Sequence, residues 1–120
     1  MGYQELIELI HKHSGLSDQE SKIALESTVE SIAVHLDESE RKDFASQLPE
    51  RLQDMALSVY PSAENTQQDI LTQIMYLNDV PQERAQKQLT SAWEALQTIL
   101  SPAGLSRIRS QLNLTLPGLA

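Results

Sequence analysis

Two pairs of side chains in this sequence have the spacing that metal or acid–base chemistry uses. Glu8 and His11 are three residues apart, which places a carboxylate and an imidazole on one helical face toward a shared metal ion. Glu26 and Glu30 are four apart, and paired carboxylates can divide the roles of general acid and general base. Acidic helices also carry both arrangements as ordinary surface pairs, and we favour that interpretation. We therefore expect no catalytic residue, no metal site and no cofactor.

An internal duplication underlies the rest of the sequence. When the chain is compared with itself, residues 5–56 align with residues 69–120 without a gap. The Glu8/His11 pair is not repeated, because Thr72 and Met75 occupy the two corresponding positions in the second copy. Most matched positions are apolar, as expected if one helical unit is used twice. Identical pairs include Ile10/Ile74, Leu25/Leu89, Ser27/Ser91, Glu30/Glu94, Leu36/Leu100, Gln47/Gln111, Leu48/Leu112 and Leu52/Leu116.

Capping signals divide the first unit into four helices. Ser17 followed by Glu20 is a capping box, and Asp37 followed by Glu40 is a second capping signal. Pro49 suits the first turn of a further helix, where its missing N–H costs nothing. Together with the spacing of apolar residues, these signals predict helices near residues 6–10, 17–36, 37–47 and 49–59.

The second unit repeats this pattern with different capping residues. Asn65 or Thr66 is expected to cap its first helix, Pro81 to begin the second and Ser101 to cap the third. The chain then reaches Pro117, which disfavours a full fourth helix. The apolar positions of its first two helices are Ile70, Leu71, Ile74, Leu77, Ala85, Leu89, Trp93, Leu96 and Leu100.

These observations predict one all-α domain of 120 residues with seven or eight helices. The first repeat covers about residues 1–60, a linker covers 61–65, and the second repeat covers about 66–120. Neither repeat is large enough for a comfortable core of its own, so we expect the two to pack with pseudo-twofold symmetry. Only five aromatic residues and four glycines argue against a β-sandwich or barrel.

Composition excludes several classes of function. Without cysteine the chain can form no disulfide, no thiolate zinc site and no cysteine nucleophile. A net charge of −8 argues against binding nucleic acid or an anionic membrane surface. No run of about 18 apolar residues is present to span a bilayer. We expect a cytoplasmic protein without membrane contact.

Negative charge is concentrated in the first half of the chain. Residues 1–64 carry 13 acidic and 5 basic side chains, whereas residues 65–120 carry 4 of each. Within the first half, one predicted helix start holds Asp37, Glu38, Glu40 and Asp43. These carboxylates stabilise a helix N-terminus and form a solvated face. The alternative is that they form an acidic patch that steers a basic partner or a second copy of the chain.

The longest identical run between the two copies is Ser-Gln-Leu, at residues 46–48 and 110–112. Structurally, Leu48 and Leu112 would be core residues, while Gln47 and Gln111 would bond exposed backbone at a helix corner. Functionally, the two corners could form a symmetric groove that binds a peptide or another helix.

Three elements of the chain carry a resemblance to a known family. They are the Tyr-x-Glu-Leu start at residues 3–6, the Gly-Leu-Ser at 15–17, and the Ala-Ser-Gln-Leu-Pro-Glu-Arg-Leu at 45–52. A second copy closes with Arg-Ser-Gln-Leu at 109–112, although Asn113 stands where Pro is expected. This succession resembles the uncharacterised bacterial family known as domain of unknown function 2267. The resemblance implies an all-helical, internally duplicated fold and brings no established activity.

Duplication, helical surfaces and the uneven charge favour a non-enzymatic protein-interaction or assembly module, with a protein partner or self-association. The alternative is a small-ligand-binding or enzymatic helical protein with a pocket between the repeats, near Trp93.

Overall fold

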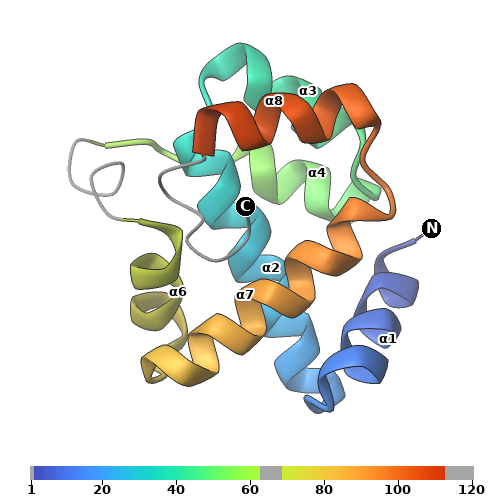
Figure 1. The fold of residues 1–120 in the computed structure, drawn as a ribbon. Coiled ribbons are helices and arrows are strands. Elements are labelled where there is room, and N and C mark those ends of the chain that lie inside the picture. The colour runs from blue at the N-terminus through green and yellow to red at the C-terminus, as the bar shows by residue number, and fades with distance from the viewer. Residues whose placement is uncertain (1, 63–68, 113–120) are drawn as a thin grey trace.

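The computed structural model describes residues 2–62 and 69–112 (Figure 1). Over these residues the chain forms seven α-helices and no strand, which confirms the all-α prediction. In chain order the helices are α1 (Tyr3–Ser14), α2 (Asp18–His35), α3 (Glu38–Ser46), α4 (Glu50–Leu57), α6 (Ile70–Asn78), α7 (Gln82–Gln97) and α8 (Pro102–Leu112).

Side-chain caps begin three of these helices where the sequence predicts them. Ser17 Oγ accepts a hydrogen bond from the backbone N–H of Glu20 at 3.1 Å. The Glu20 carboxylate does not complete the predicted capping box, and it forms an ion pair with Arg84 at 3.4 Å. Asp37 and Ser101 cap α3 and α8 in the same way, each accepting from the N–H three residues later. Local sequence therefore determines where these helices start.

Two details of α6 differ from the prediction. Its N-cap is Asp69, whose carboxylate accepts from the N–H of Thr72 at 2.7 Å. The predicted caps Asn65 and Thr66 lie outside the described residues, as does the predicted interruption at 117–118. Leu77, one of the apolar positions of the predicted helix, is 48% exposed on the last turn of α6. The buried residues of α6 are Ile70, Leu71, Gln73 and Ile74.

Helices α2 and α7 cross at the centre of the fold (Figure 1). They contact each other, and both contact α1 and α6. Leu25 on α2, Leu89 on α7 and the large ring of Trp93 are almost completely buried in one continuous hydrophobic core. Because helices pack on several sides of α2, its buried residues include serine and threonine as well as the predicted apolar stripe.

Some of these buried polar groups have partners and others do not. Asn78, the last residue of α6, donates from Nδ2 to Ser27 Oγ and to Gln88 Oε1, both at 3.0 Å. This amide ties α6 to α2 and α7. Three buried polar atoms of the described residues have no hydrogen-bond partner: Thr28 Oγ1, Ser31 Oγ and Trp93 Nε1. Each such group loses hydration without compensation.

Helices α3, α4 and α8 lie together at one end of the molecule (Figure 1). Helix α3 packs against both α4 and α8, and Phe44 and Ile108 are buried at these contacts. Arg41 of α3 reaches back to the end of α2, where Nε donates to the carbonyl of Ala33 at 2.9 Å and Nη2 donates to that of Leu36 at 2.8 Å. No helix in the described part of the chain has the length and apolar character needed to cross a membrane.

Candidate functional site

The two predicted corner glutamines bond across the α3–α8 contact. Gln47 Oε1, next to the end of α3, accepts from the N–H of Ser101 at the start of α8, at 2.7 Å. Gln111 Oε1, near the end of α8, accepts from the N–H of Asp37 at the start of α3, at 3.4 Å. The Gln111 amide also donates to the Asp37 carboxylate at 3.0 Å. Each glutamine therefore binds the N-cap residue of the opposite helix.

The leucines beside these glutamines lie in the core. Leu48 is 3% exposed and Leu112 is 1% exposed. The close approach of α8 to Gln47 depends on Gly104, because a Cβ at that position would lie 2.8 Å from Gln47 Nε2. At both corners the structure thus uses the matched residues for contacts within the chain.

The predicted acidic cluster is also largely engaged within the chain. Arg107 of α8 binds Asp43 at 2.8 Å and Glu40 at 3.3 Å. Asp37 caps α3, and hydrogen bonds from the Glu40 backbone and then from the Gln111 side chain hold the pKa of its carboxyl below its usual value. Glu38 forms an exposed pair with Lys42 at 3.3 Å. Three of the four carboxylates therefore join α3 to α8.

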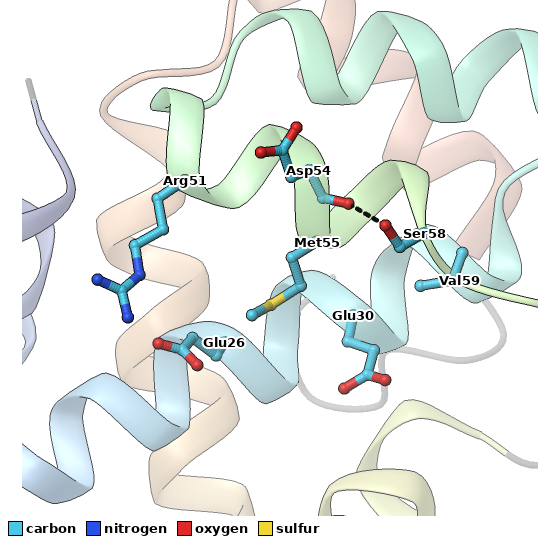
Figure 2. A pocket seen from close by; sticks show the side chains of 7 residues that line it. All are labelled: Glu26, Glu30, Arg51, Asp54, Met55, Ser58 and Val59. Atoms are coloured by element: carbon cyan, nitrogen blue, oxygen red, sulfur yellow. Dashed lines mark hydrogen bonds between the residues drawn. The ribbon is translucent and has the colours of Figure 1, made fainter.

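A groove of about 430 Å³ lies between α2 and α4. We refer to it as the α2–α4 groove, and Figure 2 shows the side chains that line it. Met55 and Val59 of its lining are partly buried and pack against the hydrophobic core. In Figure 2 the Met55 side chain lies between Glu26 and Glu30, whereas the Asp54 carboxylate points away from both glutamates. The lining residues are Glu26, Glu30, Arg51, Asp54, Met55, Ser58 and Val59.

One wall of the groove is braced by α1. The Tyr3 hydroxyl donates a hydrogen bond to Glu26 Oε2, and the Arg51 guanidinium lies over the Tyr3 ring, 4.8 Å from its centroid. Burial, followed by the hydrogen bond to the negative Glu26, raises the pKa of Tyr3 from 10.0 to about 12. The phenol therefore stays protonated and keeps Glu26 as its acceptor.

The Glu30 side chain, in contrast, forms no hydrogen bond or ion pair with any described residue. Arg51, the one basic residue among the described residues that line the groove, lies over the Tyr3 ring. Glu26 and Glu30 thus present like charges one turn apart on α2, an arrangement that is destabilising in a helix. Sequence reasoning found this glutamate pair but missed the α4 residues, because only packing brings α4 beside it.

The Glu8/His11 pair on α1 is separate from the α2–α4 groove. His11 Nδ1 lies 2.5 Å from the carbonyl oxygen of Leu16 and 4.0 Å from the Asp18 carboxylate, at the turn between α1 and α2. No group of three or more His, Asp or Glu side chains able to hold a metal ion occurs within residues 2–62 and 69–112.

Comparison with known proteins gives one match. A family model described as "Uncharacterized conserved protein (DUF2267)" matches residues 3–118. No curated protein and no solved structure matches the chain. The family model covers the seven helices of the described fold and confirms the resemblance carried by the sequence elements. The chain therefore belongs to this family of uncharacterised conserved proteins.

Proposed function

We propose that the chain is a tandem duplication of one helical unit and acts as a non-enzymatic protein-interaction module. The reciprocal glutamine caps support the duplication. In the alignment of the two halves, Ser101 corresponds to Asp37, and Gln111 corresponds to Gln47. Each glutamine bonds the capping residue of the other half. A pseudo-twofold axis between α3 and α8 would relate the Gln47–Ser101 contact to the Gln111–Asp37 contact.

The observation that carries the interaction function is the α2–α4 groove. It is open, it combines apolar and acidic side chains, and Glu30 has no partner among the described residues. The α3–α8 surface is a weaker candidate, because its carboxylates and amides already bind each other. An open, amphipathic groove on helices suits a polypeptide segment laid across it.

The groove lining also differs between the two halves of the chain. Thr90 stands at the position that corresponds to Glu26, and Thr115 at the position that corresponds to Arg51. Core leucines such as Leu25 and Leu89 are identical in the two halves. The core that the two halves share therefore does not depend on Glu26 or Arg51, whereas Glu30 has an identical counterpart in Glu94.

Site-specific cross-linking tests this function. The chain has no cysteine, so Ser58→Cys in the groove and Ser106→Cys on the exposed face of α8 each create a single attachment point for a photo-cross-linker. In a native lysate, the groove position is expected to capture protein partners that the control position does not capture. Adding Met55→Arg, which fills the groove, is expected to abolish that capture. Equal capture at both positions, or capture that survives Met55→Arg, would refute the function.

A second candidate function is binding of a small polar ligand between α2 and α7. It is favoured by the three unpartnered buried atoms on these helices, two from α2 and one from Trp93. A thermal-shift screen with a metabolite library tests it. Stabilisation of the wild type that disappears in a Thr28→Val, Ser31→Ala variant would support this function, and a flat screen would eliminate it.

A further inference from the structure

The charge balance of the α2–α4 groove indicates what kind of partner it fits. Three carboxylates and one guanidinium line it, and the guanidinium is held over the Tyr3 ring. The first half of the chain, to which the groove belongs, carries 13 acidic and 5 basic side chains. A cationic partner is therefore attracted at long range and meets two glutamates on contact, of which Glu30 has no partner among the described residues.

The apolar part of the lining suits the stem of a basic side chain. Met55 lies between Glu26 and Glu30, and Val59 lies just beyond the end of α4. Lysine and arginine side chains lay their methylenes on apolar surface while keeping their charge at its edge. A methionine adapts its shape to such a stem. A cation placed over Met55 would also relieve the repulsion between the two glutamates.

We propose that the α2–α4 groove binds a basic segment of a partner polypeptide, with one Lys or Arg stem on Met55 and Val59 and its cation between Glu26 and Glu30. The inference rests on the proposed interaction function and names the partner class. A second copy of this chain fits poorly, because each copy carries a net charge of −8 and the two would repel.

Peptide selection tests the proposal. A random peptide display library is selected on the wild-type protein and counterselected on the Glu26→Gln, Glu30→Gln variant. Enriched peptides are expected to carry Lys or Arg beside an aliphatic residue. Synthetic versions, followed by fluorescence polarisation, should bind the double variant at least about tenfold more weakly, and should bind the wild type more weakly as salt is added.

Glu94→Gln provides a matched control. Glu94 corresponds to Glu30 in the second half and is exposed on α7, away from the groove lining. This variant is expected to bind the selected peptides as the wild type does. Thermal melting of all variants separates loss of binding from loss of folding.

The outcomes distinguish this inference from the proposed function. Enriched peptides that lack basic residues, or that bind the double variant unchanged, overturn the basic partner while groove-dependent cross-linking still supports an interaction module. No enrichment at all overturns the inference, and loss of groove-dependent cross-linking overturns the function itself. A concentration-dependent dimer that Met55→Arg disrupts would replace the basic partner with a second copy.

Discussion

Replacing Gly104 with Ala tests whether the corner glutamine contacts are as tight as the structure indicates. A Cβ at residue 104 would lie 2.8 Å from Gln47 Nε2, 2.9 Å from Gln47 Oε1 and 3.1 Å from Ser101 Oγ. The amide of Gln47 would have to move, because it is the flexible end of a long side chain. Its hydrogen bond from the N–H of Ser101, now 2.7 Å, would then be lost.

Two opposing terms set the size of this effect. Loss of the Gln47–Ser101 hydrogen bond costs about 1 kcal/mol of unfolding free energy. Alanine stabilises a helix over glycine by about 0.5–1 kcal/mol. In the wild-type background the two nearly cancel, and Gly104→Ala is expected to change stability by less than about 0.5 kcal/mol. In a Gln47→Ala background the amide is absent and only the 3.1 Å approach to Ser101 Oγ opposes the helix term, so the same substitution should stabilise by up to about 0.5–1 kcal/mol.

Urea denaturation of the four proteins in this double-mutant cycle measures the coupling between the two positions. We expect a coupling energy of about 1 kcal/mol, with unchanged dependence on urea. If Gly104→Ala stabilises both backgrounds equally, the Gln47 amide does not occupy the place described, and the reciprocal caps cease to support the pseudo-twofold relation.

The remaining predictions concern single groups. Thr28→Val should raise the unfolding free energy by about 1 kcal/mol in urea denaturation, because it replaces a buried, unpartnered hydroxyl with a methyl group; a loss of stability would show that the hydroxyl has a partner. Glu26→Gln should lower the pKa of Tyr3 from about 12 in an NMR titration without restoring 10.0, because burial is its largest cause. The raised pKa also means that the contribution of Tyr3 to stability is complete below pH 10.0 and lost by about pH 12, so alkaline unfolding should begin in that window. Gln111→Ala should raise the pKa of the Asp37 carboxyl in a carboxyl NMR titration, because the substitution removes one of the hydrogen bonds that lower this pKa. In the wild type, the stability linked to the Asp37 carboxyl is present above its ordinary pKa of 3.8 and declines as the pH falls through the lowered value.

Local signals made the helices predictable from the sequence. The caps at Ser17, Asp37 and Ser101 each bond an N–H three residues away, so the residues that form them are neighbours in the chain. Apolar periodicity similarly identified Leu25, Leu89 and Trp93 as core.

The use of the polar side chains could not be predicted in the same way. The acidic residues at the start of α3 were recognised as a cluster, but Arg107, which neutralises two of them, lies in the other half of the chain. Similarly, Glu26 and Glu30 were recognised as a pair, whereas Tyr3 and Arg51 reach that pair from other helices. Sequence spacing cannot give these contacts, because each depends on how two helices are placed in three dimensions.

The sequence by itself determined the helical class, the gap-free alignment of its two halves, the main caps and the apolar core, because these depend on residue types and on interactions within one or two helical turns. Only the tertiary structure decided that the corner glutamines and most of the acidic cluster bind within the chain, and that a groove opens beside Glu30. The reason is physical: a polar side chain binds whichever partner the packing of distant helices brings within about 3 Å.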